Sequence, residues 1–221
     1  MFFWALAASP DDIGLHFVLA ELLLSAEQYE PAAEEIRAVL AREPRAVEAG
    51  NVILGLIASE DGRRAFLRGD PPAAGGAATS PWWGTFQAAP AGLADPATNA
   101  ATVIAVKAAW ADVPRRSGTI DGRPFTFLRD ADDLLGPGLD VVSGGDYALI
   151  PFDSLTRIEL GPIQSPLERI WRPVTHTFVN GASFAAFVPG NYAGSARLGG
   201  ASALGSVTAS LGVARPVLTP R

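Results

Sequence analysis

The sequence predicts a multidomain α+β protein in which a helical region similar to a tetratricopeptide repeat precedes a small antiparallel α+β domain. Two observations predict this fold class. Apolar residues recur with a helical period up to about residue 69, whereas beyond Thr119 they alternate with the period of two that is typical of strands. In addition, turn dipeptides such as Asp121-Gly122 and Asn180-Gly181 separate the alternating segments. We therefore expect helices in the front of the chain and β-hairpins in the back.

Composition limits the classes of function. The chain has 221 residues, of which 48% are hydrophobic and 18% charged, and its formal net charge is −6. This acidic balance argues against general binding of nucleic acid or anionic membranes, because phosphate recognition requires a basic surface. Cysteine is absent, so disulfides, Cys-ligated zinc and thiol chemistry are excluded. The start MFFWALAASP lacks the basic region of a signal peptide, and no later apolar run approaches the ~18 residues of a membrane span.

The front region, residues 1–69, has the pattern of consecutive helices. Asp11 and Asp12 offer N-cap oxygens to a first helix that is apolar on nearly every side, which is typical of a helix packed between neighbours. A polar break at residues 26–28 separates it from a second helix, which ends at Pro44 because proline cannot continue a helix. The expected arrangement is a helix–turn–helix pair.

A third helix is expected over about residues 46–59, with a break at residues 60–62. The first two helices are similar to one tetratricopeptide repeat, because small, large and terminating residues fall at the positions that this repeat requires. These residues are Leu19, Ala20, Leu23, Tyr29, Ala32, Ile36, Val39 and Pro44. The small alanines would let two helices approach closely enough to stack. Only one repeat is clear, and a plain antiparallel helical bundle stays open as the alternative.

Residues 70–95 are expected to form a linker, because they begin with the Pro/Gly/Ala-rich stretch DPPAAGGAATSP. The linker carries the adjacent pair Trp82-Trp83. Two neighbouring tryptophans are not expected to enter the same core. One of them is therefore predicted to cover a domain interface or a partner site.

The back region, residues 96–221, combines a helix with antiparallel strands. An alanine-rich helix over residues 96–112 is expected to end before Pro114. Three hairpins are predicted, which pair residues 119–120 with 125–128, 141–142 with 147–150, and 175–179 with 183–188. A further strand is expected at 156–160, and a short helix capped by Ser165 at 166–171. The Asn-Gly pair in the last hairpin predicts a type I′ turn. The Gly/Ala/Ser-rich tail after Ser195 specifies little structure.

The chain offers few residues for catalysis. Its two histidines, His16 and His176, have no neighbouring metal-binding motif such as HExxH, and neither a GxSxG elbow nor a P-loop is present. Asp130, Asp132 and Asp133 are too closely spaced for an EF-hand and lack its glycine and distal glutamate. We expect Asp130 and Asp132 to accept backbone N–H bonds at a chain corner. No catalytic, cofactor-binding or metal-binding residue is predicted, and the protein is not expected to be an enzyme.

A set of punctuating residues in the back region forms a recognisable pattern. The residues are Asp121-Gly122, Asp130-Ala131-Asp132, Gly136-Pro137, Leu139-Asp140, Gly145, Tyr147, Pro151-Phe152, Ile170-Trp171-Arg172-Pro173, Val188-Pro189, Tyr192 and Gly194-Ser195. In this pattern the chain resembles the ImpE/TagJ (SciE-type) accessory proteins of bacterial type VI secretion systems. The resemblance extends from about residue 11 to residue 195. The start MFFWALAASP looks shorter than is usual in the family, and the stretch LGGASALGSVTASLG departs from the family pattern.

The resemblance implies a non-enzymatic, cytoplasmic adaptor without cofactors. Family members are expected to bind the small subunit of the contractile sheath through that subunit's N-terminal helix, and to assist sheath turnover alongside the AAA+ unfoldase. Neither nucleic acid nor a membrane is expected as a partner. A helix that docks in an apolar groove is commonly held by aromatic anchors, and the candidates are Trp82, Trp83, Tyr147 and Trp171. The alternative is a generic helical-repeat interaction module with an unrelated client.

Overall fold

A computed structural model of the chain describes residues 9–70, 81–133 and 135–198. Its α-helices are α2 (Ile13–Ser25), α3 (Tyr29–Arg42), α4 (Val47–Arg68), α5 (Pro81–Ala94), α6 (Asn99–Ala109) and α7 (Leu167–Ile170). Its strands are β1 (Gly118–Ile120), β2 (Arg123–Phe125), β3 (Gly138–Ser143), β4 (Asp146–Pro151), β5 (Leu155–Leu160), β6 (Trp171–Phe178) and β7 (Ser183–Pro189). Short 3₁₀ turns are η1 (Pro44–Ala46), η2 (Phe152–Ser154) and η3 (Ser195–Leu198).

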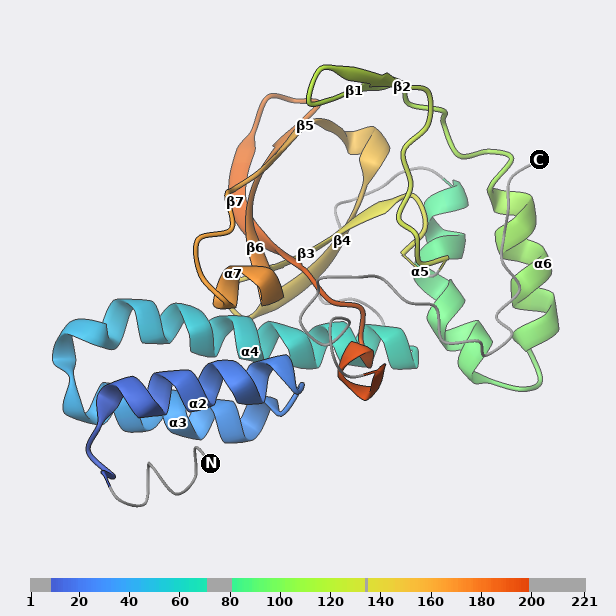
Figure 1. The fold of residues 1–221 in the computed structure, drawn as a ribbon. Helices are drawn as coiled ribbons and strands as arrows, with labels where there is room; N and C mark the ends of the chain where they lie inside the picture. Colours follow the sequence, from blue (N-terminus) through green and yellow to red (C-terminus); the bar gives the residue numbers. More distant parts are fainter. Residues whose placement is uncertain (1–8, 71–80, 134, 199–221) are drawn as a thin grey trace.

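The helices surround one end and one side of a strongly curved sheet (Figure 1). Helices α2, α3 and α4 lie along one end of the five-stranded sheet, and the pair α5–α6 stands beside it (Figure 1). A separate two-stranded hairpin, β1–β2, lies at the end of the sheet away from α4 (Figure 1). The predicted α+β class, with helices followed by antiparallel strands, is confirmed.

Helices α2 and α3 form a closely packed pair. Asp12 caps α2, because its Oδ1 accepts a hydrogen bond from the backbone N–H of Leu15 at 3.1 Å. On the buried faces of the pair, Ala20, Ala32 and Ala33 let the two backbones approach each other. The predicted helix–turn–helix arrangement is present.

Helix α4 is longer than the sequence predicted. The expected break at residues 60–62 is wrong, since one helix of 22 residues runs through it. Contacts with the sheet outweigh the weak helix propensity of this stretch. Glu60 is buried, and Gly62 lies so close to β4 that an added Cβ would be 3.3 Å from the Cβ of Tyr147. The helix ends instead at Gly69, whose positive φ of 115° is typical of a helix C-terminus.

Helices α5 and α6 form a second close pair. Helix α5 occupies part of the segment that the sequence assigned to a linker, and residues 71–80 lie outside the described residues. Helix α6 falls within the predicted helix over 96–112. An added Cβ on Gly92 of α5 would lie 2.2 Å from Oγ1 of Thr102 on α6. The pair therefore approaches as closely as a glycine allows.

The β1–β2 hairpin forms at the predicted Asp121-Gly122 turn, but its second strand is Arg123–Phe125 rather than residues 125–128. The β3–β4 hairpin forms as predicted. Asp121 and Gly122 both have positive φ, 50° and 77°, as a type I′ turn requires. In the second hairpin, Gly144 and Gly145 take φ values of 60° and 99°. The turn residues thus fix the register of both hairpins.

The turn between β6 and β7 differs from its prediction. The register of the two strands places Asn180 at the centre of the loop, so the loop is not the two-residue type I′ turn. Gly181 has a φ of 88°, and its N–H donates to the carbonyl of Phe178 at 2.9 Å. This is the geometry of a type I turn followed by a left-handed glycine. The Asn-Gly signal predicted the hairpin correctly but not its turn type.

The five-stranded sheet has the order β4-β3-β7-β6-β5 with antiparallel neighbours. Its edge strands β4 and β5 are joined through η2, and the sheet is strongly curled (Figure 1). The face inside the curl carries a small apolar cluster formed by Val141, Ile150, Val174 and Ala186. The opposite face shares one large core with the helices, to which it contributes Val142, Tyr147, Leu149 and Trp171.

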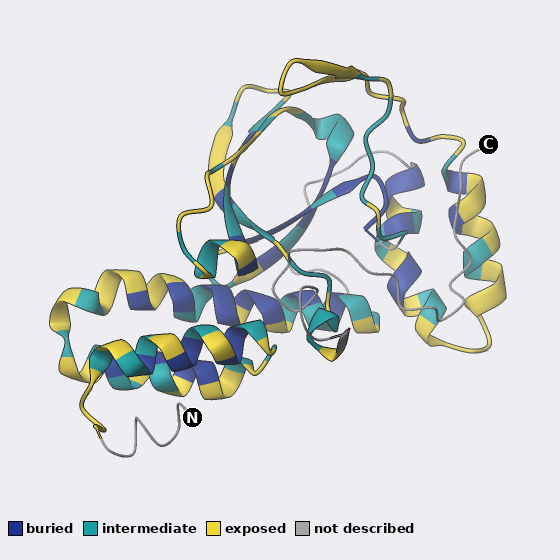
Figure 2. Cartoon of the chain, in the orientation of Figure 1, coloured by how far each residue is buried: buried dark blue, intermediate teal, exposed yellow. Residues whose placement is uncertain are grey.

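The buried residues lie where the helices meet the sheet. They run along α4, the adjoining strands and α5, whereas the β1–β2 hairpin is exposed (Figure 2). Among the described helices, none has the length and apolar character needed to cross a membrane.

Candidate functional site

The acidic corner that follows the β1–β2 hairpin is held by its own hydrogen bonds. Oδ1 of Asp130 accepts the backbone N–H of Asp132 at 2.7 Å and the hydroxyl of Tyr192 at 3.0 Å. Asp133 forms an ion pair with Arg129. Burial raises the pKa of the Asp130 carboxyl, although both hydrogen bonds act in the opposite direction. Asp130 thus accepts a backbone hydrogen bond as predicted, and no His, Asp and Glu side chains of the described ranges are grouped to hold a metal ion.

A buried charged network joins helix α4 to the sheet. Arg63 of α4 donates from Nε to Oδ2 of Asp140 on β3 at 2.8 Å, and from Nη1 to Oε2 of Glu60 at 3.4 Å. Its Nη2 also donates to the backbone carbonyl of Asn191 at 3.1 Å. Oε1 of Glu60 accepts the indole N–H of Trp171 at 2.9 Å. One arginine therefore connects α4, β3 and the segment that follows β7.

The charges of this network depend on one another. Burial acts against the charged form of Arg63, but the adjacent carboxylates of Asp140 and Glu60 outweigh it and raise the pKa of the guanidinium. Burial raises the pKa of Asp140, against the attraction of Arg63. Burial and the charge of Asp140 also raise the pKa of the Tyr147 hydroxyl, which stays protonated. The network therefore holds a permanent cation between acids in a desolvated site.

The buried charged network holds α4 against the sheet. The side chains of Glu60, Arg63 and Asp140 are only 3%, 4% and 6% exposed. A general acid or base has to come within hydrogen-bond reach of its substrate. The network lacks such access and acts as the connection between the helical front and the sheet.

The tryptophan pair lies in the core. Trp82 and Trp83 are 7% and 1% exposed, so the expectation that two neighbouring tryptophans cannot enter one core is wrong. Consecutive residues of a helix point about 100° apart, and α5 has neighbours on more than one side. Trp83 lies against β3, where an added Cβ on Gly138 would be 2.8 Å from its ring. Trp82 packs edge-on against Phe86, with ring centroids 6.2 Å apart.

The other two aromatic candidates are also buried. Tyr147 and Trp171 are each 1% exposed. Tyr147 packs against Phe66 of α4 at 5.5 Å between ring centroids, and Trp171 lies 6.3 Å from the ring of Tyr29. Both belong to the contact between the helices and the sheet. The four predicted partner anchors therefore present no exposed ring in this structure.

Sequence reasoning missed the residues that carry the network. Glu60 lies in the stretch 60–62 that was assigned to a helix break, and Arg63 directly follows that stretch. Asp140 was noted only as part of the family pattern. The available signal was the Glu-x-x-Arg spacing, which places opposite charges on one helix face. Nothing in the sequence identifies the distant carboxylate that completes the group.

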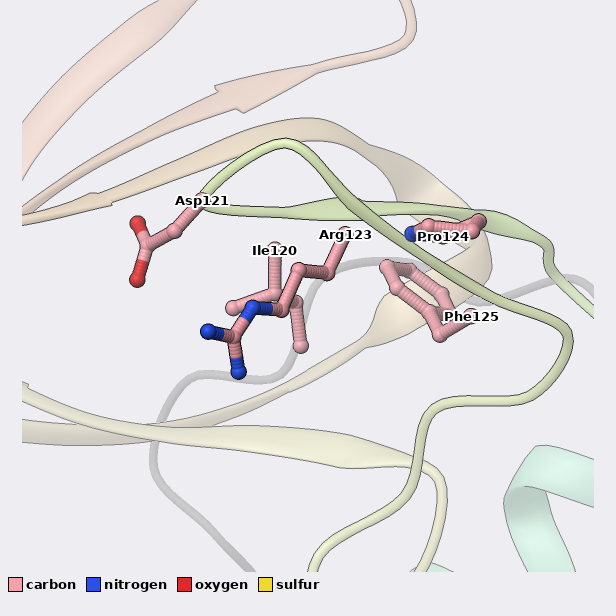
Figure 3. A pocket seen from close by; sticks show the side chains of 5 residues that line it. All are labelled: Ile120, Asp121, Arg123, Pro124 and Phe125. Carbon is pink, nitrogen blue, oxygen red and sulfur yellow. The ribbon is translucent and has the colours of Figure 1, made fainter.

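The described surface has two apolar features of interest. The exposed large apolar side chains are Val18, Leu22, Val47, Val52, Ile104, Ile120, Leu160, Ile163, Val179 and Phe184. Val18 and Leu22 form a row on α2. A hollow of about 460 Å³ lies beside the β1–β2 hairpin (Figure 3) and is lined by Ile120, Asp121, Arg123, Pro124 and Phe125.

Residues 122–219 match the sequence profile of the family described as ImpE protein. The chain is also similar to the type VI secretion system accessory component TagJ of Pseudomonas aeruginosa, with 35% identity over 80 residues. That match covers 36% of this chain and 28% of TagJ, so the chain spans little more than a quarter of this relative. Protein VPA1032 of Vibrio parahaemolyticus has a similar fold, with a TM-score of 0.82 at 22% identity, over 93% of this chain and 77% of that protein.

The ImpE match covers one side of the buried network. It begins within the β1–β2 turn and includes Asp130, Asp140, Trp171 and Tyr192, whereas Glu60 of α4 precedes it. The fold likeness to VPA1032 covers nearly the whole chain and therefore includes both the helical front and the sheet.

Proposed function

We propose that the protein is an accessory component of a bacterial type VI secretion system and acts as a non-enzymatic adaptor. The observation that carries this proposal is the ImpE match over residues 122–219. The partial similarity to TagJ supports the same system, since that relative is described as a type VI secretion accessory component. The family resemblance of the acidic corner and of the Trp-x-Pro segment agrees with it.

The chemistry of the described polar groups supports an adaptor rather than an enzyme. The buried acids Glu60 and Asp140 and the half-buried Asp130 are bonded to an arginine, a tyrosine, a tryptophan or the backbone. The larger hollow is lined by Asp121 and Arg123 as its charged residues, without a histidine or a second carboxylate. Catalytic acids and bases require convergent groups around a substrate space.

The partner in this proposal is the small subunit of the contractile sheath, bound through its N-terminal helix in the cytoplasm. The complex would assist sheath turnover alongside the AAA+ unfoldase. A helix docks by placing its apolar face against an exposed apolar surface, with a few side chains contributing most of the affinity. Exposed Ile120 and the hollow beside it offer a surface of this kind.

A second candidate function is that of a generic helical-repeat interaction module with an unrelated client. The apolar row on α2 favours it, because Val18 and Leu22 are four residues apart and are 38% and 45% exposed. In this alternative the client contacts the helical front. The sheet region would then serve only to support the helices.

Co-purification from the cell that encodes this chain tests the proposal. We expect the tagged full-length protein to retain the sheath subunits, and the purified protein to bind the small subunit with a Kd in the micromolar range or tighter. A titration with a peptide of that subunit's N-terminal helix should give a similar Kd. Absence of binding by a protein whose circular dichroism shows it folded would refute the sheath adaptor.

A further inference from the structure

The β1–β2 hairpin is the most isolated element of the described structure. Its strands pair only with each other, and all of its residues except Phe125 are exposed (Figure 2). The type I′ turn at Asp121 and Gly122 nevertheless fixes its shape. At its base, Arg116 donates from Nη2 to the carbonyl of Asp153 at 3.0 Å, which ties the hairpin to η2. A defined element is thus presented to solvent without contributing to the core.

One face of this hairpin carries apolar and cationic side chains together. Ile120 is the cross-strand partner of Arg123, and Gly118 is the partner of Phe125, so these positions share a face. An added Cβ on Gly118 would lie 2.7 Å from Cζ of Phe125. The phenyl ring therefore lies directly over the glycine and is held in place. Figure 3 shows Ile120, Arg123 and Phe125 on the same side of the hairpin, around the hollow of about 460 Å³.

The charge of the hairpin is opposite to that of the whole chain. The chain has a formal net charge of −6, whereas Arg115, Arg116 and Arg123 lie in or next to the hairpin with Asp121 as the only acid between them. Among the described residues, Arg115 and Arg123 form no ion pair. A local cationic surface on an acidic protein favours an acidic partner and guides it to this place.

We propose that the β1–β2 hairpin is the docking surface for the partner, and that the bound segment of the sheath small subunit is a helix with apolar residues next to carboxylates. This inference rests on the proposed sheath adaptor function and names the surface and the chemistry of its ligand. Ile120 and Phe125 contact the apolar residues of the helix, and Arg123 pairs with its carboxylates. The hollow has the volume of a small binding pocket, which is enough for anchoring side chains and not for a whole domain.

Two substitutions in the full-length protein test the docking surface. Ile120→Asp is expected to raise the Kd for the sheath small subunit by about thirtyfold or more, because it removes an apolar anchor and adds a repelling charge. Arg123→Glu is expected to raise the Kd about tenfold and to reduce the dependence of binding on salt. Both positions are exposed, so circular dichroism and the thermal melt should match those of the unmodified protein.

Matched controls separate the hairpin from other surfaces. Arg37→Glu on α3 makes the same charge change on an exposed arginine, and Leu22→Asp changes the apolar row of α2. Neither should change the Kd by more than about twofold. Replacement of the acidic residues of the partner helix by lysine should weaken binding to the unmodified protein and restore binding to Arg123→Glu.

The outcomes distinguish the two proposals. If the unmodified protein binds and both hairpin variants bind equally well, the docking surface is refuted while the sheath adaptor stands. The same holds if only Leu22→Asp weakens binding, which would assign the site to the helical front. If the unmodified protein does not bind the sheath small subunit, both proposals fail together.

Discussion

The contact within the helical front and the contact between the front and the sheet are built differently. In the front, α2 and α3 pack through Ala20, Ala32 and Ala33, none more than 1% exposed, and these residues are close in sequence. Between the front and the sheet, Arg63 reaches Asp140 across 77 residues of chain, in addition to the apolar contacts. Local packing therefore follows from helical periodicity, whereas the joint between the regions depends on a buried ion group.

The difference has energetic consequences. An apolar contact loses stability in proportion to the volume that is removed from it. A buried ion group loses much more when one member is removed, because the remaining charges stay desolvated and uncompensated. We therefore expect substitution of Arg63 to lower the free energy of unfolding more than substitution of any other polar residue of the described structure. Its guanidinium donates hydrogen bonds to two carboxylates and a backbone carbonyl.

Arg63→Ala is the largest expected effect and tests this comparison directly. The substitution leaves the carboxylates of Glu60 and Asp140 buried without their cation, so the free energy of unfolding should fall by about 3–5 kcal/mol. Urea denaturation near neutral pH, followed by circular dichroism, measures this change.

Arg37→Ala is the matched control for the ion pair. Arg37 pairs with Glu30 on α3, and their side chains are 55% and 72% exposed. The expected loss is below about 1 kcal/mol, because exposed ion pairs contribute little. Equal losses for the two arginines would show that the buried network does not join the regions as described.

The parts of the fold that the sequence predicted correctly are those determined by neighbouring residues. The Asp121-Gly122 turn formed as expected because both residues can take positive φ. The break at residues 60–62 was wrong because contacts with β4 and Trp171 stabilise a helix that local propensity does not favour. The α+β class could be predicted from periodicity, whereas the length of α4 could not.

The candidate site was predictable only in part for the same reason. The corner role of Asp130 followed from its short-range bond to Asp132. Its second bond, from Tyr192, joins residues 62 apart and has no local signal. Burial of both Trp82 and Trp83 likewise depends on how many elements surround α5, which composition does not reveal.

Asp130→Asn tests a hydrogen-bonded acid that is less buried than those around Arg63, so its effect on stability should be smaller. Asparagine keeps one side-chain oxygen for the N–H of Asp132 and the hydroxyl of Tyr192, but these two hydrogen bonds are weaker without the charge of the carboxylate. We expect a loss of about 1 kcal/mol in the free energy of unfolding and unchanged partner binding. Tyr192→Phe, measured by the same urea titration, should give a similar loss. Stoichiometric divalent metal that is bound by the purified protein and lost in the asparagine variant would contradict a structural role.

The pKa values of the two histidines shift in opposite directions, one in the helical front and one in the sheet. In the front, His16 has Nδ1 2.5 Å from Oε2 of Glu35 and Nε2 3.0 Å from the carbonyl of Pro10. Only the imidazolium can donate to both, so Glu35 and then Pro10 raise the pKa of His16, against burial and the charge of Arg42.

In the sheet, His176 lies between aromatic rings. The ring centroids of Phe178 and Phe184 are 5.4 Å and 6.1 Å from its own. Its Nδ1 makes no hydrogen bond with the described residues, and burial lowers its pKa. Protonation is therefore favoured by folding at His16 and opposed by folding at His176.

The smallest expected effects are the opposite pH dependences of the two histidines. The contribution of His16 is fully present below its unfolded pKa, near 6.5, and is lost as pH rises through its higher folded pKa. The contribution of His176 is present above its unfolded pKa, and the fold is destabilised as pH falls through that value toward the lower folded pKa. Urea titrations at about pH 5 and about pH 8 give the change in unfolding free energy across this window. His176→Phe should raise stability at the acidic pH relative to the basic pH, and His16→Gln should do the reverse. A shift of the same sign in both variants would show that the two regions do not hold their histidines in opposite protonation states.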